Sequence, residues 1–287
     1  MTHVATMPRL ISQPRRAFLR LLLADAVRSR WLAFTACTYV VVFGAFIWLG
    51  LRESSVLGFT GLSRVILNLA NAVALVLPLV SLVATSQSIV RARSAGFFEL
   101  FLAQPCRRSD WFAAMLASRV LVIAGPLWVL LLLALGTGAL RGETGLALIT
   151  LRSALVTLSL SFAFIGAGLL VSALARTAER ATVYALLVWL FASALHDFAL
   201  IGVLLRVHMP PQLVFALAAL NPVEAARLAL LGSIDPNLAV LGPVGFWISN
   251  QLGASLLLAF GIGWPCLLGV LCLAGCMRLL NRMDLAG

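Results

Sequence analysis

The chain has 287 residues, of which 62% are hydrophobic and 11% charged, and its formal net charge at pH 7 is +11. Soluble domains carry roughly 25% charged residues, so this composition excludes a water-soluble enzyme, a disordered chain and a free nucleic-acid-binding protein. A mean hydropathy of +1.06 is typical of a helical protein that crosses a membrane several times. Because no linker or repeat divides the sequence, we expect one transmembrane domain over residues 1–287.

Before the first apolar run, residues 15–30 predict an amphipathic helix. Helical spacing puts apolar side chains between positions 18 and 26 on one stripe, and Arg16, Arg20 and Arg28 roughly opposite. We expect this N-terminal helix to lie on the cytoplasmic membrane surface and to end at the interfacial Trp31.

Six stretches of more than 20 residues carry almost no charge, and each is long enough to cross about 30 Å of hydrocarbon as a helix. The predicted spans are 31–51, 65–90, 120–140, 153–175, 181–205 and 251–277. The predicted fold class is therefore all-α, with six transmembrane helices.

The arginines indicate the orientation of these spans. With both chain ends on one side of the membrane, that side holds 15 of the 21 arginines and the other side six; the sequence has no lysine. Cytoplasmic loops collect cations, so both termini are expected in the cytoplasm, and the positive charge reflects topology rather than nucleic-acid binding.

The cytoplasmic loop 91–119 predicts a short helix with an apolar face, a break at Pro105, and a second helix capped by Ser109 or Asp110. It carries Phe97, Phe98 and Phe101 around Glu99. Phenylalanines on a solvent-side loop favour docking of a partner protein. The alternative, which composition supports equally, is that this helix packs beneath the bundle.

The outer connection 206–250 contains five prolines that divide it into pieces too short to span a membrane. Asn221-Pro222-Val223-Glu224 predicts a helix start, with Asn221 as cap, Pro222 in the first position and Glu224 reaching back to the cap. The helix is expected to stop at Gly232. We expect short re-entrant helices that dip into the outer leaflet.

No catalytic motif is present: there is no zinc-binding His-Glu-x-x-His, no Gly-x-Ser-x-Gly, and no phosphate-binding loop, which would need a lysine. We therefore expect no enzyme activity, catalytic residue, metal site or cofactor in this chain. The remaining polar candidates in or near the spans are Arg152, His196 and Asp197. Arg152 and Asp197 are predicted near the outer face, either as an ion pair that joins two helices or as a lining of an exit path.

The order of these elements resembles the permease subunits of type-2 ABC exporters. A more specific likeness is to the permeases that serve maturation of nitrous-oxide reductase, a copper enzyme. At the entry to the second span, the matching segments are Leu57-Gly58-Phe59-Thr60-Gly61-Leu62-Ser63, 67–71 and 77–79. In the coupling segment, the matching residues are Gly96, Glu99-Leu100, Pro105 and Arg108. Arg152, Asp197 and Leu220-Asn221-Pro222 also stand where the family has Arg, Asp and Leu-Asn-Pro.

This resemblance implies the permease subunit of an ATP-driven exporter in the bacterial inner membrane. It implies a second permease copy, most simply in a homodimer, a cytoplasmic ATPase subunit that binds the ATP, and a periplasmic accessory protein. The residues expected to couple the ATPase to the bundle are Gly96, Phe97, Phe98, Glu99, Phe101, Pro105 and Arg108, with the N-terminal helix beside them.

Departures from the family pattern keep alternatives open. Arg91-Ala92-Arg93 replaces an acidic pair, Phe97 replaces a threonine, and Gln104 replaces a tyrosine. These changes favour, as one alternative, a membrane scaffold for envelope enzyme assembly that transports nothing. Another alternative is an exporter of a lipid, a drug or a peptide.

Overall fold

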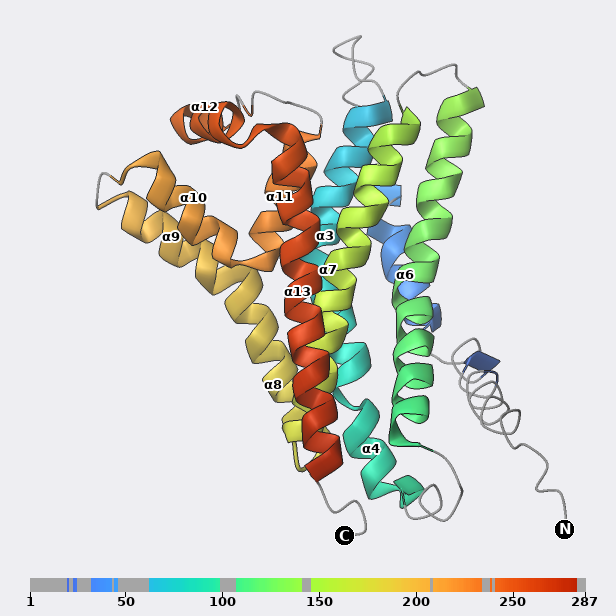
Figure 1. Ribbon diagram of the computed structural model, residues 1–287. Helices are drawn as coiled ribbons and strands as arrows, with labels where there is room; N and C mark the ends of the chain where they lie inside the picture. The colour runs from blue at the N-terminus through green and yellow to red at the C-terminus, as the bar shows by residue number, and fades with distance from the viewer. Residues whose placement is uncertain are drawn as a thin grey trace, which may run out of the picture.

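The computed structural model describes residues 20, 23–24, 32–42, 44–45, 62–98, 107–140, 146–206, 209–233, 238 and 241–282. Every regular element in these ranges is a helix, which confirms the predicted all-α class. Long helices run side by side, α10 and α12 lie at one end of the bundle, and α4 lies at the other (Figure 1).

A short apolar helix over Leu32–Val42 comes first in the described ranges. The elements that follow are α3 (Leu62–Ser86), α4 (Ser88–Ser94), α6 (Arg108–Leu140), α7 (Leu146–Leu174), α8 (Ala178–Leu190), the π-helical turn η1 (Phe191–Leu195), α9 (His196–Leu204), α10 (Pro211–Leu220), α11 (Pro222–Gly232), α12 (Gly242–Gln251) and α13 (Gly253–Arg282).

Five helical stretches are long and apolar enough to cross a membrane, and they coincide with predicted spans two to six. They are Ala74–Ser94, Arg108–Gly136, Ala147–Leu174, Ala178–Leu204 and Gly253–Arg282. The bent pair α10–α11 makes a sixth if it is taken as one span. Of the predicted first span, 31–51, the structure describes 32–42 and 44–45.

The second helix predicted within segment 91–119 is present, but it begins at Arg108, so Ser109 and Asp110 lie inside it and the predicted cap is wrong. Helix α4 continues to Ser94, and α6 begins at Arg108, well before the predicted span at 120. Trp111, Phe112 and Met115 are buried against α7 and α13. Because packing stabilises this first part of α6, the helix extends beyond the residues that are apolar enough to be predicted as a span.

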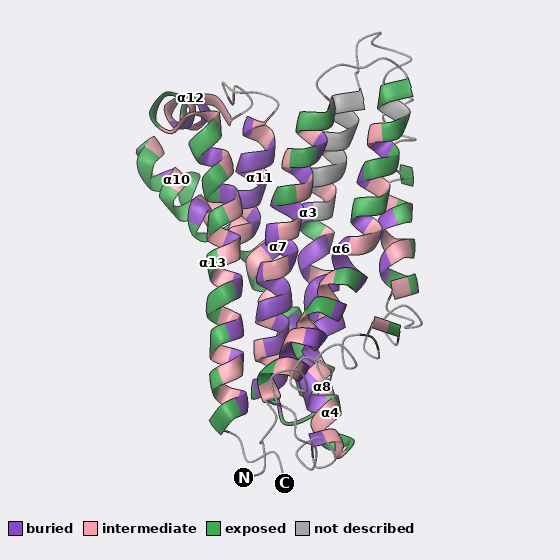
Figure 2. Cartoon of the chain, turned by 45° about the vertical axis from the view of Figure 1, so that its right-hand side comes forward, coloured by how far each residue is buried: buried purple, intermediate pink, exposed green. Residues whose placement is uncertain are grey.

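Helix α7 lies at the centre of the bundle, with α3, α6 and α13 around it (Figures 1 and 2). Glycines bring its neighbours close. A Cβ atom built on Gly166 would lie 2.8 Å from the carbonyl oxygen of Gly269, and one on Gly168 would lie 2.0 Å from Thr85 Oγ1. Helix α7 therefore packs backbone to backbone against α13, and its backbone lies directly against the Thr85 side chain of α3.

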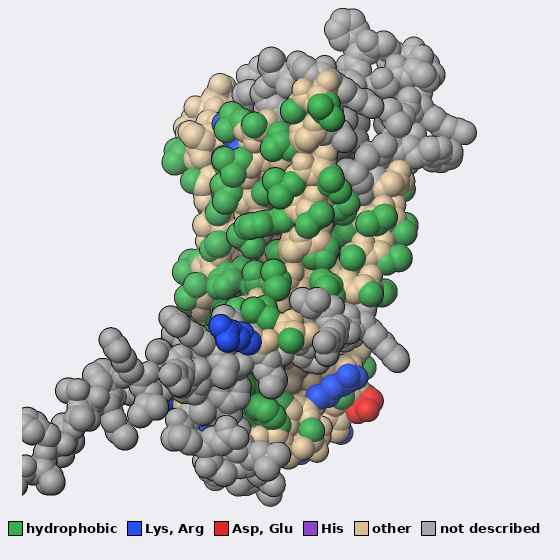
Figure 3. All heavy atoms as spheres, turned by 90° about the vertical axis from the view of Figure 1, so that its right-hand side faces the viewer, with side chains coloured by type: hydrophobic (Ala, Val, Ile, Leu, Met, Phe, Trp, Pro, Cys, Tyr) green, Lys and Arg blue, Asp and Glu red, His purple; other side chains and the backbone are tan. Residues whose placement is uncertain are grey.

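The outer faces of the bundle are apolar. On α6, Val129 and Leu132 are 57% and 64% exposed. Figure 3 shows hydrophobic side chains over the length of one face, with the visible charged side chains toward its two ends. This distribution suits a bundle surrounded by lipid.

The chain bends by 117° between α10 and α11, with Asn221 at the corner. Asn221 Oδ1 accepts a hydrogen bond from Val223 N at 3.0 Å, and α11 ends at Gly232, so the predicted helix start and end are confirmed. The predicted contact of Glu224 with its cap is wrong. The backbone N–H of Asn221 already donates to Ala218 O, and the Glu224 carboxylate accepts from Arg227 instead.

Candidate functional site

A one-residue break at Gln87, which we call the elbow, separates α3 from α4. The first N–H groups of a helix have no partner within it, and Ser172 of α7 supplies one, because its Oγ accepts from Ile89 N at 2.9 Å and from Val90 N at 3.2 Å. Gln87 Nε2 donates to Thr182 Oγ1 of α8 at 2.6 Å. The elbow is therefore attached to both α7 and α8.

Two arginines near this elbow cap the C-terminal ends of helices. Arg93 donates to the carbonyl oxygen of Ala175, directly after α7, at 2.5 Å, and Arg108 donates to Leu280 O in the last turn of α13 at 2.7 Å. Carbonyls at helix C-termini lack helical partners and favour cations. Arg108, a predicted coupling residue, thus joins the start of α6 to the end of α13.

Gly96 and the phenylalanines after it form a compact corner. Gly96 has φ of +68°, a conformation in which glycine avoids the strain of other residues, and its N–H donates to Arg93 O. Phe98 is only 2% exposed, and its ring centroid lies 5.0 Å from that of Trp111. Of the two alternatives for this segment, packing beneath the bundle therefore holds for Phe98.

Several predicted residues lie outside the described ranges. In the coupling segment these are Glu99, Phe101 and Pro105, and in the N-terminal helix they are Arg16, Arg28 and Trp31. Arg20 is described, and it is helical and exposed.

At the opposite end, the π-helical turn η1 interrupts the fifth predicted span just before His196 and Asp197. Arg227 Nη1 donates to Asp197 Oδ2 at 3.2 Å and to Glu224 Oε1 at 2.5 Å. His196 Nδ1 lies 3.7 Å from Asp197 Oδ1. We call these four residues the outer polar cluster, in which two carboxylates share one guanidinium group.

The predicted ion pair between Asp197 and Arg152 is wrong. Asp197 pairs with Arg227, whereas Arg152 sits near the start of α7. The prediction paired charges only between long spans and did not consider α11, the short helix whose Arg227 supplies the cation. The sequence did indicate that Arg227 could form an ion pair in α11, since Glu224 and Arg227 have the i,i+3 spacing of a helical pair.

Three side chains tie the α10–α11 corner to its surroundings by bonding to backbone carbonyls, and sequence reasoning did not find these contacts. They are Asn221 Nδ2 to Ala192 O at 2.6 Å, His196 Nε2 to Leu217 O at 3.1 Å, and Trp264 Nε1 to Leu220 O at 3.1 Å. Ala192 lies in the π-helical turn, where the changed hydrogen-bond register makes its carbonyl available to an outside donor.

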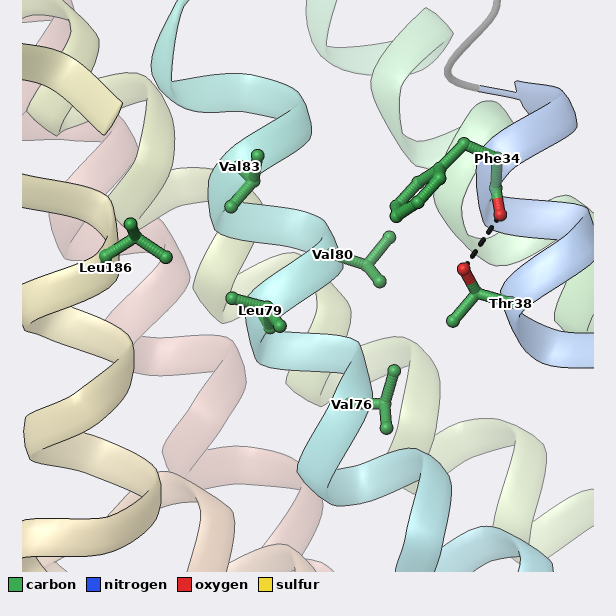
Figure 4. A pocket seen from close by; sticks show the side chains of 7 residues that line it. All are labelled: Phe34, Thr38, Val76, Leu79, Val80, Val83 and Leu186. Carbon is green, nitrogen blue, oxygen red and sulfur yellow. Dashed lines mark hydrogen bonds between the residues drawn. The ribbon is translucent and has the colours of Figure 1, made fainter. Parts of the chain in front are cut away.

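An apolar groove of about 500 Å³ runs over α3, between the helix Leu32–Val42 and α8 (Figure 4). Its lining residues are Phe34, Thr38, Val76, Leu79, Val80, Val83 and Leu186. The Thr38 hydroxyl donates to Phe34 O of its own helix at 2.9 Å, so the groove offers mainly hydrocarbon contact.

Together these features define a multi-pass helical membrane protein with an arginine-capped helical elbow at one end and the bent helix pair α10–α11 at the other. Residues 22–285 match the family described as ABC-2 family transporter protein, and the chain belongs to this family. Permeases of this family work with ATPase subunits and have no ATPase domain of their own. The chain is therefore a membrane permease subunit and not itself the ATPase.

Two relatives extend over most of the chain. One is the "Probable ABC transporter permease protein NosY" of Pseudomonas aeruginosa, which is 27% identical over 267 residues, covering 84% of this chain and 94% of that protein. The other is the protein of the same name from Stutzerimonas stutzeri, which is 25% identical over 256 residues, covering 86% of this chain and 89% of that protein.

Proposed function

We propose that this chain forms part of the transmembrane pathway of an ATP-driven exporter that serves maturation of a periplasmic copper enzyme. The observation that carries the proposal is the similarity to permeases named NosY, which extends over more than four-fifths of the chain. The sequence motifs that resemble permeases of nitrous-oxide reductase maturation support the same assignment.

We infer that the arginine-rich end faces the cytoplasm, because cytoplasmic ends of membrane helices collect cations. The described arginines at this end of the long helices are Arg91, Arg93, Arg107, Arg108, Arg119, Arg176, Arg180, Arg278 and Arg282. Those at the other end are Arg64, Arg152, Arg206 and Arg227. In this orientation α10, α11 and α12 face the periplasm, where an accessory protein would bind.

The ATPase subunit is proposed to dock at the corner formed by α4 and Gly96. A push on this corner reaches the bundle through two connections, Ser172 to the first turn of α4 and Arg93 to the end of α7. Since Phe98 is buried, its role in this proposal is to keep the corner rigid, while the residues after it make the contact with the ATPase.

A second copy of the chain is proposed to cover the face formed by α8 and the groove over α3. The fifth span is apolar yet has little cover from the rest of the chain: Val183, Leu187 and Phe191 are 53%, 56% and 65% exposed. Two such faces related by a two-fold axis would enclose a pathway between the copies. ATP-driven movement of the elbows would then open this pathway alternately to each side.

The first test is a pull-down of the tagged chain in mild detergent, with mass spectrometry and an ATPase assay. The proposal expects a separate ATPase subunit with vanadate-sensitive activity, and a deletion strain whose periplasmic copper enzyme lacks copper. Recovery of envelope assembly factors without an ATPase would favour the scaffold hypothesis. Normal copper loading in the deletion strain would refute the copper-enzyme role while leaving the ATPase result intact.

Coupling is tested in the same purified complex with Glu99→Ala. We expect this variant to lose most of the permease-dependent ATPase response at unchanged expression, because Glu99 directly follows the proposed docking corner. Ser249→Ala is a suitable control, since Ser249 lies in α12 at the other end of the bundle and its hydroxyl donates to Phe246 O of its own helix in an exposed position. An unchanged response in Glu99→Ala would contradict the proposed contact.

A further inference from the structure

The π-helical turn η1 contains one residue more than a regular helical turn, at the point where the α10–α11 corner contacts the fifth span. In an α-helix the N–H of His196 would donate to the carbonyl oxygen of Ala192, four residues back. Here it donates to Phe191 O, five residues back. Ala192 O accepts instead from Asn221 Nδ2 at 2.6 Å. The π form of this turn thus uses an outside donor where the α form would use its own backbone.

Asn221 links this turn to the corner. The residue is 5% exposed, and its Oδ1 caps α11 by accepting from Val223 N at 3.0 Å. Its Nδ2 holds Ala192 O at the same time. One amide side chain therefore fixes both the start of α11 and the hydrogen-bond register of η1.

The π form is not the conformation that the fifth span would adopt by itself. Turns of this kind are rare, and the Ser193 hydroxyl within η1 is buried without a hydrogen-bond partner in the described part of the chain. Without Asn221, the carbonyl of Ala192 would lose its partner as well. An α-helical turn would give that carbonyl the N–H of His196. We therefore expect η1 to become α-helical when the corner moves away.

This conversion would rotate α9 about its own axis. Each residue of an α-helix accounts for about 100° of rotation, so absorbing the extra residue rotates the following helix by about that angle. All residues of α9 are described and none is buried, and apart from His196 and Asp197 they are apolar. Phe198 and Ile201 are 72% and 53% exposed, and Figure 1 shows α9 at the edge of the bundle. Rotation of α9 therefore disrupts no buried core.

Two polar contacts hold α9 in its present orientation. His196 Nε2 bonds to Leu217 O of α10 at 3.1 Å, and Asp197 pairs with Arg227 of α11 at 3.2 Å. Both partners belong to the same helix pair as Asn221. Departure of that pair from the fifth span therefore removes all three contacts together, so the orientation of α9 and the position of the pair change in one step.

We propose that η1 is a register switch that couples the α10–α11 pair to the fifth span. With the pair in place, Asn221 holds the π form, and α9 presents His196 and Asp197 to the pair. When the pair moves away, η1 becomes α-helical and α9 rotates by about 100°. The switch converts displacement at this end of the bundle into rotation of a span. It goes beyond the proposed copper-enzyme role and depends on neither the cargo nor the ATPase.

The switch is tested by double electron–electron resonance on the full-length chain in detergent. Spin labels are attached through p-acetylphenylalanine, so the native cysteines remain, and labelled chain is diluted with unlabelled chain. One label is at Ile201 or Val203, which lie about 200° apart around α9. The reference label is at Val129 of α6 or at Phe246 of α12, and all four positions are exposed.

Asn221→Ser should release the switch. Serine is as good a helix cap as asparagine, so α11 keeps its cap, but the serine side chain has no amide to reach Ala192 O. We expect a second distance population at each label position, because a rotation of about 100° displaces a side chain by roughly 8 Å around a helix 10–12 Å across. The labels at Ile201 and Val203 should shift in opposite senses, since they lie on nearly opposite faces.

Deletion of Ala194 is the matched control. It removes the extra residue of η1, so a regular α-helix forms while α9 still faces the α10–α11 pair. This deletion should keep the distances of the unchanged chain. It should also abolish the second population caused by Asn221→Ser, because no alternative register remains.

Opposite shifts that disappear on deletion of Ala194 support the switch. Unchanged distances in Asn221→Ser overturn it. Shifts in the same sense at both label positions mean that α9 swings as a rigid arm, and a second population that survives the deletion means that the register of η1 is not involved. Either result also overturns the proposal. If the deletion variant does not fold, the relative sense of the shifts at Ile201 and Val203 decides.

Discussion

Arg227 is the residue on which the outer polar cluster depends. One nitrogen of its guanidinium group contacts Asp197 of α9 and Glu224 of its own helix, and the three side chains are between 20% and 30% exposed. Loss of Asp197 leaves the Arg227–Glu224 pair intact. Loss of Arg227 leaves two carboxylates close together without a cation, which is the more unfavourable case.

We therefore predict that Arg227→Gln destabilises the protein more than Asp197→Asn. The expected losses are about 2 kcal/mol or more for Arg227→Gln and about 1 kcal/mol or less for Asp197→Asn. The measurement is the apparent Tm of the purified chain in detergent. Arg206→Gln, at an exposed position just after α9, should leave Tm unchanged, and equal decreases for the two cluster variants would argue against a shared cation.

At the scale of elements, helix α11 can lie close to α13 because α13 has a glycine, Gly261, at the point of contact. A Cβ atom on Gly261 would lie 2.3 Å from Ala229 Cβ and 2.7 Å from the carbonyl oxygen of Ala225. Both alanines belong to α11, so glycine at position 261 lets this short helix sit against α13. A Cβ atom on Gly263, two residues further along, would meet nothing within 4 Å.

Gly261→Ala should consequently push α11 away from α13 and lower stability by about 1–3 kcal/mol, the usual range for overpacking. Gly263→Ala is the matched control and should be neutral or slightly stabilising, because alanine favours the helix. The measurement is the apparent Tm of both variants in detergent. If the two substitutions behave alike, the close approach of α11 does not limit packing here.

At the elbow between α3 and α4, one side chain, that of Ser172, holds the start of α4 in place. Ser172 satisfies the backbone N–H groups of Ile89 and Val90, which have no helical partners of their own. Removal of its hydroxyl leaves two buried donors unpaired, at a cost of about 1–3 kcal/mol each.

We predict that Ser172→Ala loosens α4 without unfolding the bundle. Amide hydrogen exchange over residues 87–94 should become at least about fivefold faster, while exchange in the centre of α7 stays slow. Ser161→Ala is the control in the same helix, since the Ser161 hydroxyl bonds only to Leu158 O within α7. Unchanged exchange at 87–94 would show that other contacts hold the elbow.

For the whole molecule, the two ends differ in charge and in architecture. The arginine-rich end holds the elbow and the helix ends capped by Arg93 and Arg108, and the other end holds the bent pair α10–α11. If the first end is cytoplasmic, the proposed ATPase contact at the corner of α4 and Gly96 and the proposed contact with a periplasmic partner at α10–α12 lie at opposite ends of the bundle.

This orientation predicts opposite labelling at two exposed positions. In a cysteine-free background, Leu205→Cys should react with a membrane-impermeant maleimide in cells whose outer membrane alone is permeabilised. Glu179→Cys should react only after the inner membrane is opened as well. Both positions are exposed in the described structure, so accessibility within the protein does not limit the reaction. The reverse pattern would invert the proposed orientation.

The sequence alone determined the approximate positions of the five long helices that the structure describes, because an uncharged stretch of more than 20 residues can satisfy its backbone in lipid only as a helix. It also determined the start of α11, since the Asn221-Pro222 cap is a local interaction that needs no distant partner. Only the tertiary structure decided that Asp197 pairs with Arg227 instead of Arg152, that Phe98 packs inward, and that Ser172 holds α4. These contacts join residues about 20 or more positions apart or depend on how elements pack, and their energies depend on neighbours that a linear pattern does not specify.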